Sequence, residues 1–316
     1  MILNTDKAGL ELKMPSTNTQ YRIITDAKYG YQKLDPLPTN EEISQFYQKD
    51  YFKLIKKGGR APELRRLMSG GKEVRDERNW LETTLYSDIC VFLNRYAKGK
   101  HLLDVGRGTG DLILYLKKNG FDVTGIEPST EAAVIAKQKS LKVYNTSFEV
   151  FAANHNVDSS AGFDAVVLIN ILEHVTDPVQ VIDTVKKILK PAGILCVRVP
   201  NDFTEMQEAA QRRLNKERWW VAIPDHINYF NLETLPKFLK SLGFEILYSQ
   251  SDFPMELFLL MGDDYVGNSD VGEKCHKKRV AFEDALPHEL RRKFYAALAS
   301  CGIGRDCLLF AKKNHS

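Results

Sequence analysis

The sequence is poor in cysteine, and the few cysteines form no metal-binding or redox pattern. Five are scattered along 316 residues: Cys90, Cys196, Cys275, Cys301 and Cys307. Their number is odd, and none has the C-x-x-C spacing of a zinc ribbon or a redox motif. Cys275 is followed by a histidine, but no further ligands stand at metal-binding spacing. We therefore expect reduced thiols in a cytoplasmic protein, with no disulfide scaffold and no metal.

Long hydrophobic runs and a large net charge are also missing. The longest apolar runs, residues 166–169 and 258–261, are far short of the roughly 20 residues that a membrane-spanning helix needs. Residues 1–16 lack the apolar stretch of a secretory signal and the arginine-rich pattern of a transit peptide. With 44 Lys+Arg against 41 Asp+Glu, the formal net charge is only +3. The sequence thus predicts no membrane span and no nucleic-acid partner, and it specifies no oligomeric state.

What is present is the composition of an ordinary globular protein. Hydrophobic residues make up 43% and charged residues 27%, so the chain can bury a normal core without disulfide or metal staples. A length of 316 residues is typical of about two domains, or of one large domain with appendages.

An α/β pattern dominates from residue 101 onward. The pattern predicts strands at 101–105, 121–126, 141–145, 163–169 and 192–199, and helices at 111–120, 130–139 and 177–190. A helix at 79–96 precedes them, and a helix at 232–242, a strand at 244–251 and a last strand at 306–312 follow. Such alternation is typical of βαβ units. It predicts an α/β fold with a doubly wound sheet, covered on both faces.

These elements divide the chain into four expected parts. Residues 1–78 form an N-terminal arm and a helical cap or lid, and residues 79–251 form the core. Residues 252–304 look mostly helical and are interpreted as an insertion that caps the substrate. Residues 305–316 provide the last core strand.

The N-terminal part holds an aromatic segment and a basic one. Thr39 or Asn40 is expected to cap a short helix that carries Tyr47. Residues 53–78 hold nine basic and four acidic residues, so their local net charge is 9 − 4 = +5. One interpretation is a solvated connection. The other is a basic lid over an anionic ligand, with residues 56–66 contacting it and with Arg60 and Arg65 as candidate contacts beside Tyr47.

A glycine-rich turn joins the first strand of the core to the next helix. Asp104 lies near the end of that strand, and Gly106, Gly108 and Gly110 follow at G-x-G-x-G spacing. Such a turn lets the backbone approach a ligand, and the helix start offers free N–H donors. The second strand ends in Glu127, where an acid can accept hydrogen bonds from a ribose diol. The pattern indicates an adenosine-type ligand; a tight turn without any ligand is the alternative.

The spacing of the glycines argues against a nicotinamide dehydrogenase. Dinucleotide binders need G-x-G-x-x-G, and Asp111 stands where their third glycine would be. An acid in the first helical turn is a poor neighbour for a pyrophosphate. It is compatible with a ligand whose near end is cationic or zwitterionic, such as a sulfonium amino acid.

Later motifs complete an ordered set. The strand at 163–169 leads through Asn170 into the segment Leu172-Glu173-His174-Val175, and a turn at 190–193 precedes the next strand. With the glycine turn, this set resembles the class I S-adenosylmethionine-dependent methyltransferases. The resemblance is closest to their small-molecule branch, which includes ubiquinone-biosynthesis and sugar methyltransferases. It covers about residues 79–251.

The resemblance implies a cofactor site. In that family the turn matching Asp104–Gly110 holds the methionine end of S-adenosylmethionine, and the acid matching Glu127, next to Pro128, binds the ribose. Residues after the later strands flank the adenine and the sulfonium, and these would be Ser147, Phe148, Ile169 and Asn170.

The resemblance also implies a seven-stranded sheet whose last strand is antiparallel, with residues 304–312 as that edge strand. The chain departs from the family at two positions. Arg107 replaces a small residue in the glycine turn, and Ala192 replaces the first glycine of the usual proline–glycine–glycine turn.

Two histidines are candidates for a base. His226 lies in a proline–x–histidine loop of a kind that, in this branch, lies near the transferred methyl group, and Asp225, Asn228 and Tyr229 flank it. An alcohol acceptor needs a base, and histidine titrates near neutral pH. His174 is the second candidate. For each histidine the alternative is a side chain that only hydrogen-bonds the loop backbone. Trp220 and Tyr229 are interpreted as core or as the wall of the acceptor pocket.

The expected function is methyl transfer from S-adenosylmethionine to a small or glycan-linked polar acceptor. We expect O-methylation by in-line displacement, with a histidine assisting deprotonation. Two alternatives stay open: a protein or peptide methyltransferase, and a catalytically silent cofactor-binding scaffold. The intact glycine turn and Glu127 argue against the scaffold.

Overall fold

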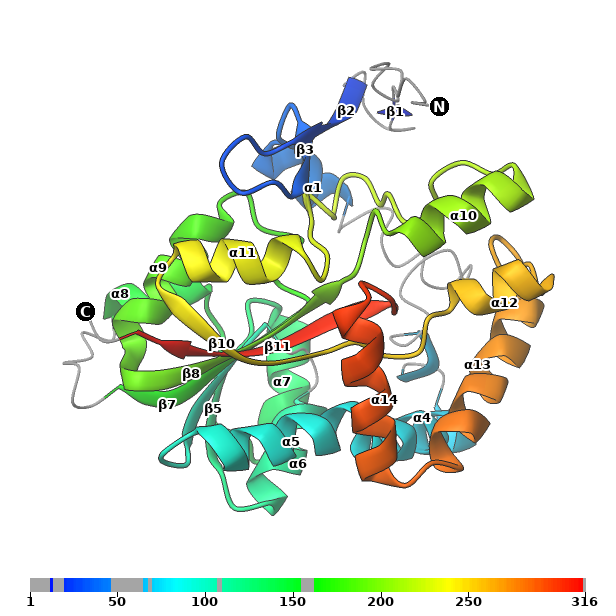
Figure 1. The fold of residues 1–316 in the computed structure, drawn as a ribbon. Coiled ribbons are helices and arrows are strands. Elements are labelled where there is room, and N and C mark those ends of the chain that lie inside the picture. The colour runs from blue at the N-terminus through cyan, green and yellow to red at the C-terminus, as the bar shows by residue number, and fades with distance from the viewer. Residues whose placement is uncertain are drawn as a thin grey trace.

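The computed structural model describes residues 12–13, 20–46, 65–67, 70–106, 110–154 and 162–314. Its centre is a seven-stranded sheet in the order β10-β11-β8-β7-β4-β5-β6 (Figure 1). The strands are β4 (His101–Val105), β5 (Asp122–Ile126), β6 (Val143–Tyr144), β7 (Phe163–Ile169), β8 (Leu189–Pro200), β10 (Phe244–Gln250) and β11 (Asp306–Lys313). Strands β8, β7, β4, β5 and β6 pair in parallel. The predicted doubly wound sheet is confirmed.

Helices cover both faces of this sheet (Figure 1). One face packs against α8 (Phe148–Asn154), α9 (Pro178–Ile188) and α11 (Thr234–Ser241), and the other against α5 (Leu85–Tyr96), α6 (Asp111–Lys118) and α7 (Thr130–Gln138). Every residue of β7 is buried, which explains why this strand reads as an almost unbroken apolar run.

The last strand is not at the edge of the sheet. β11 pairs antiparallel with β8 on one side and with β10 on the other. Its antiparallel direction was predicted correctly, but the prediction of an edge position is wrong. Residues 307–311 are at most 3% exposed, as expected for a strand that is covered on both faces and paired on both sides.

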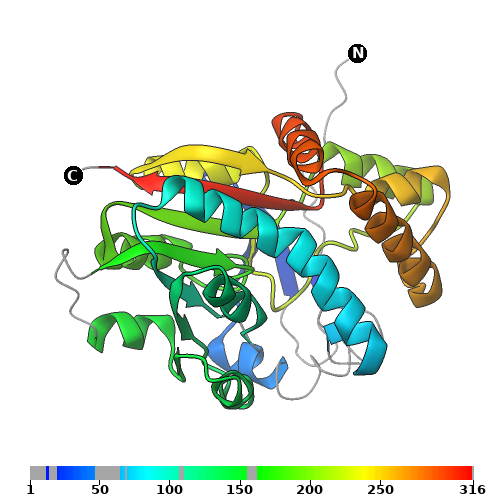
Figure 2. The same cartoon turned by 90° about the horizontal axis from the view of Figure 1, so that it is seen from below.

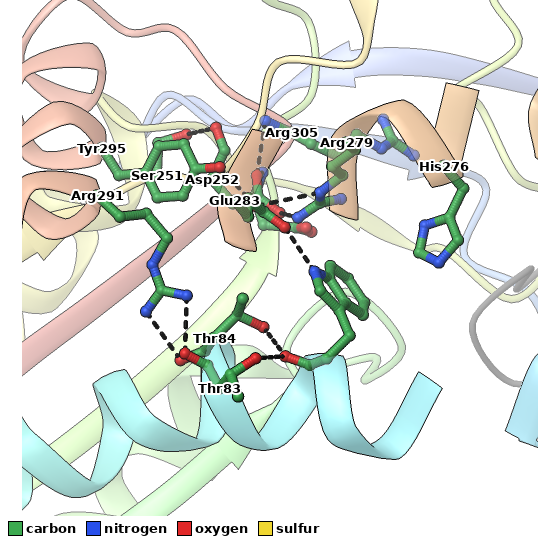
Figure 3. A network of polar contacts seen from close by, with 12 residues as sticks. Thr83, Thr84, Ser251, Asp252, His276, Arg279, Glu283, Arg291, Tyr295 and Arg305 are labelled. Atoms are coloured by element: carbon green, nitrogen blue, oxygen red, sulfur yellow. Dashed lines mark hydrogen bonds and ion pairs between the residues drawn. The ribbon is translucent and has the colours of Figure 1, made fainter. Parts of the chain in front are cut away.

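The predicted helix at 79–96 is two helices. α4 (Gly71–Thr83) ends at Thr84 and α5 begins directly after it. The Thr84 hydroxyl donates to the Trp80 carbonyl oxygen at 2.5 Å, and the Arg291 guanidinium donates to the carbonyl oxygens of Thr83 and Thr84 at 2.9 and 3.4 Å (Figure 3). A buried arginine from a distant helix thus satisfies the carbonyl groups that the break exposes. Local sequence signals contain no trace of such a partner.

The N-terminal part contains more strand than the expected helical cap. β1 (Leu12–Lys13), β2 (Gln20–Thr25) and β3 (Gln32–Asp35) form a small antiparallel sheet whose fourth strand is β9 (Asn228–Tyr229). The predicted short helix is α1 (Asn40–Phe46). Thr39 caps it, because its hydroxyl accepts from the Glu42 N–H at 3.2 Å while the Glu42 carboxylate accepts from the Thr39 N–H at 2.9 Å.

The insertion before the last strand is helical, as predicted. It consists of α12 (Glu256–Met261), α13 (Ser269–Asp284) and α14 (His288–Ser300). In Figure 2 the cyan segment of α4 and α5 runs across the sheet toward these orange helices. A further helix, α10 (Glu205–Leu214), follows β8 and was not predicted. None of the helices that the structure describes has the length and apolar character needed to cross a bilayer.

Gly304, at the entry to β11, allows a test of this packing. Its φ is +129°, and a β-carbon there would overlap the Ser251 hydroxyl and lie 2.8 Å from the Asp252 carbonyl oxygen. Gly302 has a φ of +74° with no atom within 4 Å of such a carbon. We expect Gly302→Ala to lower the free energy of unfolding by roughly 1 kcal/mol and Gly304→Ala by more than about 3 kcal/mol. Urea unfolding of both variants measures this, and equal losses would contradict it.

Candidate functional site

The glycine turn lies where parallel strands end at one edge of the sheet. Gly106 has a φ of +70°, and its N–H donates to the Ile126 carbonyl oxygen at 2.7 Å, which ties the end of β4 to the end of β5. Gly110 has a φ of +75° and precedes the first residue of α6. Positive φ values of this kind favour glycine. Asp104 is fully buried in β4. Gly108 and its neighbours Arg107 and Thr109 lie outside the described residues.

Glu127 follows β5 at the same edge. Its N–H donates to the Tyr144 carbonyl oxygen at 3.0 Å, and its carboxylate accepts from the Ser129 N–H at 2.8 Å. The Asn145 amide donates to the carbonyl oxygens of Glu127 and Pro128, each at 3.0 Å. These contacts fix the loop after β5, so the acid has a defined position beside the glycine turn.

Two further predicted cofactor residues begin α8, a helix that sequence reasoning missed. The Ser147 hydroxyl accepts from the Val150 N–H at 3.3 Å, as an N-terminal cap does. Phe148, the first residue of α8, is buried. The sequence signal that could have predicted this helix was Ser147, because serine is a preferred N-terminal cap.

The strand β7 brings the last two predicted cofactor residues to the same edge. Ile169 is buried at its end. Asn170 follows with a φ of +54°, and its N–H donates to the Arg198 carbonyl oxygen at 2.8 Å. The Arg198 guanidinium donates to the Asn170 side-chain oxygen at 3.0 Å. The described candidates for cofactor binding therefore gather at the carboxyl ends of β4, β5 and β7 and at the start of α8.

Asp111 has a different role from the one expected. Its carboxylate binds Lys139 at 2.9 Å and Arg78 at 3.3 Å. These two cations come from the end of α7 and from α4, so Asp111 fastens those segments to the start of α6. Its charge is balanced by the protein, which weakens the argument that it selects a cationic ligand.

The two candidate histidines are brought together. Their ring centroids lie 4.9 Å apart at an interplanar angle of 84°. His174 Nδ1 lies 2.7 Å from the Asp225 carbonyl oxygen. Because a carbonyl only accepts, the proton of neutral His174 is on Nδ1, and Nε2 is left as the basic atom. Asp225 thus orients His174 through its backbone carbonyl.

Hydrogen bonds fasten the His226 loop to the turn after β7. The Glu173 carbonyl oxygen accepts from the Ile227 N–H at 2.6 Å and from the Asn228 N–H at 3.1 Å. The Asn228 amide donates to the carbonyl oxygens of Leu172 and Val175 at 2.8 and 2.7 Å. On its other side the loop pairs with β3. The two histidines are therefore held relative to each other by main-chain contacts.

Sequence reasoning left Glu173 out of the site. The side chain is buried, with Oε1 3.8 Å from His174 Nε2, and burial raises the pKa of its carboxyl well above the ordinary value. Ligand atoms of Glu173, His174 and His226 lie within 4.8 Å of one another, close enough for the three residues to share a metal ion. The sequence signal that could have placed Glu173 in the site was its position next to the candidate base His174, in the segment Leu172-Glu173-His174.

The predicted acceptor residues have mixed positions. Trp220 and Tyr229 are both buried, and the ring of Phe203 meets the ring of each edge to face. Tyr47 and Arg60 lie outside the described residues, and Arg65 is half-buried. Arg66, the last of residues 56–66 that were expected to contact the ligand, binds the Glu77 carboxylate of α4 through two nitrogens at 2.6 and 2.8 Å. This end of the lid segment is attached to α4.

The family model described as "Methyltransferase domain" matches residues 80–249, which is more than half of the chain. The chain belongs to this methyltransferase family. Membership confirms the predicted family, and with it S-adenosylmethionine as the cofactor.

Curated relatives are similar in sequence to only part of this chain. A ubiquinone biosynthesis O-methyltransferase of Haemophilus ducreyi is 38% identical over 109 residues, which are 33% of this chain and 46% of that enzyme. One of Photorhabdus laumondii is 35% identical over 130 residues, 40% of this chain and 48% of that enzyme. The chain thus spans about half the length of these curated relatives.

Solved structures with similar folds are more distant in sequence. A SAM-dependent methyltransferase from Archaeoglobus fulgidus is 15% identical, covers 84% of this chain and 100% of that chain, and has a TM-score of 0.49.

The methyltransferase also buries an acid with an unusual pKa directly after β8. Asp202 accepts a hydrogen bond from Gln207 at 3.1 Å and lies 3.7 Å from Arg305. Burial raises the pKa of Asp202 to about 6, although Arg305 and Gln207 oppose the shift. The folded state therefore keeps a proton between pH ~4 and ~6 that the unfolded chain releases. This group lowers the stability of the fold as the pH rises through that window.

Asp202→Asn should remove that loss. We expect the unfolding free energy of the variant, relative to the wild type, to rise by on the order of 2 kcal/mol between pH 4 and pH 7. Because the comparison is a difference between two curves, other titrating groups cancel. Urea unfolding at several pH values measures it. Parallel curves for the two proteins would contradict the pKa that we assign to Asp202.

Proposed function

We propose that this chain transfers the methyl group of S-adenosylmethionine to a hydroxyl of a small or glycan-linked polar acceptor. The observation that carries the proposal is the joined edge of β4 and β5, where the Gly106 N–H binds the Ile126 carbonyl oxygen. This bond sets the glycine turn beside Glu127. The methionine end and the ribose belong to the same S-adenosylmethionine molecule. The glycine turn that would bind the first and the Glu127 carboxylate that would bind the second must therefore lie next to each other.

The proposed cofactor contacts follow the edge of the sheet. The Asp104–Gly110 turn and the first N–H groups of α6 face the methionine end, and Glu127 accepts the ribose hydroxyls. The pair Ser147-Phe148 lies at the start of α8, and the pair Ile169-Asn170 lies at the end of β7. We assign these pairs to the adenine and to the neighbourhood of the sulfonium.

The acceptor is proposed to be an alcohol or phenol. The curated relatives are named as O-methyltransferases, which supports oxygen as the acceptor atom. Methyl transfer from a sulfonium needs in-line positioning, exclusion of water and removal of the acceptor's proton. We propose that the buried core around Trp220 and Tyr229 supports the wall of the acceptor pocket, and that Arg65 contributes from the basic segment. Tyr47 and Arg60 stay predictions.

The geometry favours His174 over His226 as the base. The Asp225 carbonyl oxygen at 2.7 Å holds the proton of His174 on Nδ1, so Nε2 is ready to accept a proton from the acceptor. The ring of His226, 4.9 Å away, is assigned to orienting the acceptor hydroxyl. The order of the two candidates is thus the reverse of the one predicted from the sequence, where His226 came first.

A direct assay tests the proposed function. The protein is incubated with S-adenosylmethionine and separate panels of sugars, nucleotide sugars, quinols, catechols and peptides, and production of S-adenosylhomocysteine is measured. We expect turnover with a hydroxylated small molecule or a glycan. Turnover with peptides alone would indicate a peptide methyltransferase. Binding of the cofactor without turnover in any panel would indicate a silent scaffold.

Glu127→Ala tests the ribose contact. The substitution removes charge-assisted hydrogen bonds to the ribose hydroxyls, so we expect S-adenosylhomocysteine to bind about 10–100-fold more weakly. Glu131→Ala, on the exposed first turn of α7, is the matched control and should bind like the wild type. Isothermal titration calorimetry measures both. Unchanged affinity in Glu127→Ala would rule out the assignment.

Substitution of each histidine separates their roles. We expect His174→Ala to lower kcat by about 10²–10⁴-fold, with activity recovering as the pH rises and the acceptor loses its proton without help. His226→Ala should raise the acceptor's KM more than it lowers kcat, and His288→Ala, an exposed control, should change neither. Cofactor affinity should persist in all three. If His174→Ala keeps wild-type turnover across the pH range, this histidine is not the base.

A further inference from the structure

Arg198 contacts Asn170 twice, once through its main chain and once through its side chain. Its carbonyl oxygen accepts from the Asn170 N–H at 2.8 Å, and its Nη1 donates to the Asn170 Oδ1 at 3.0 Å. Arg198 lies in β8 and is 9% exposed. Asn170 stands where the chain leaves β7, in a left-handed conformation. One buried residue of the neighbouring strand thus controls both the backbone and the side chain of Asn170.

This contact fixes which way the Asn170 amide faces. A guanidinium has only donors, so the amide atom facing Arg198 must be the oxygen. The NH2 group of Asn170 therefore lies on the side away from Arg198. Asn170 is half-buried, and it follows β7 at the edge where the glycine turn and Glu127 also lie. Its two N–H donors are available for an acceptor atom at that edge.

The second nitrogen of Arg198 connects Asn170 to the start of β11. Nη2 donates to the Asp306 carboxylate at 2.6 Å, and the Asp306 N–H donates to the Asp252 carboxylate at 2.9 Å. Burial raises the pKa of Asp306, with Arg198 opposing the shift. Burial also acts on Asp252, but Arg279 and Arg198 together bring the pKa of that carboxyl below its ordinary value. Asp252 therefore remains an anion between its cationic neighbours.

The same contacts continue into the helical insertion (Figure 3). Arg279 of α13 donates to Asp252 at 2.9 Å and to Glu283 at 3.3 Å. Glu283 in turn accepts from the Trp80 indole N–H of α4 at 2.6 Å. A cavity of about 40 Å³ lies beside these side chains, lined among others by Trp80, Arg198 and Arg279. A continuous series of polar contacts therefore joins α4 and the insertion to Asn170.

We propose that Arg198 is a positioning residue for the cofactor: it holds the Asn170 amide so that its N–H donors face S-adenosylmethionine. This inference rests on the proposed function. Arg198 itself lies outside the proposed binding site. Arg198 acts through Asn170 and touches no ligand itself. The pairing of Nη2 with Asp306 holds the guanidinium in the orientation in which Nη1 reaches the Asn170 Oδ1.

A double-mutant cycle on Arg198 and Asn170 tests this, with S-adenosylhomocysteine as the titrant. We expect Asn170→Ala and Arg198→Met each to weaken binding about 3–10-fold, because each removes or releases one hydrogen bond to the ligand. The double variant should be no weaker than the worse single variant, since both act on the same contact. Lys216→Met, which breaks the Lys216–Asp264 ion pair elsewhere, is the control and should bind like the wild type.

Asn170→Asp separates positioning from folding. An aspartate keeps an oxygen for Arg198 but has no N–H donors, so we expect wild-type thermal stability with the binding loss of Asn170→Ala. Arg198→Lys keeps a cation beside Asp306, but one ammonium replaces a planar fork, so binding should be only partly restored relative to Arg198→Met. These two variants carry the test if Arg198→Met does not fold.

The outcomes distinguish this inference from the proposed function. Wild-type affinity in Arg198→Met or in Asn170→Asp, or additive losses in the double variant, would overturn the positioning role while leaving the methyltransferase assignment intact. A wild-type protein that binds no S-adenosylhomocysteine would overturn the cofactor site, and the positioning role with it.

Discussion

The parallel pairing of β4 with β5 and β7 is the constraint on which the rest of the site depends. It brings three chain segments, which follow residues 105, 126 and 169, to one edge of the sheet. The Gly106 N–H bond to the Ile126 carbonyl oxygen then joins the first two of them. Each segment carries different chemistry: glycines, an acid, and an amide. The sheet makes a single site out of groups that are far apart in the sequence.

The proposed acceptor side is built in a different way, by one loop held between two partners. The loop that carries His226 pairs with β3 on one side, and Asn228 binds the turn after β7 on the other. The Asp225 carbonyl oxygen then orients His174. The N-terminal sheet thereby supports the loop that carries the candidate histidine His226.

Local patterns predicted the parts of the fold that depend on local chemistry. Apart from α8, the strands and helices from 101 to 190 were readable, and so was the cap at Thr39. The place of β11, the break at Thr84 and the orientation of His174 were not, because each is decided by a residue far away in the sequence. The Arg291 contact to Thr84 spans 207 positions, and the Arg198 contact to Asp306 spans 108. Sequence periodicity contains no information about such pairs.

The central claim is that S-adenosylmethionine binds along the edge formed by β4, β5 and β7, and a crystal structure with S-adenosylhomocysteine tests it most directly. The account predicts the ribose hydroxyls on the Glu127 carboxylate, the homocysteine end over the 104–110 turn, and the sulfur on the side of His174 and His226. A ligand bound elsewhere, or bound at this edge with its ribose away from Glu127, would contradict it.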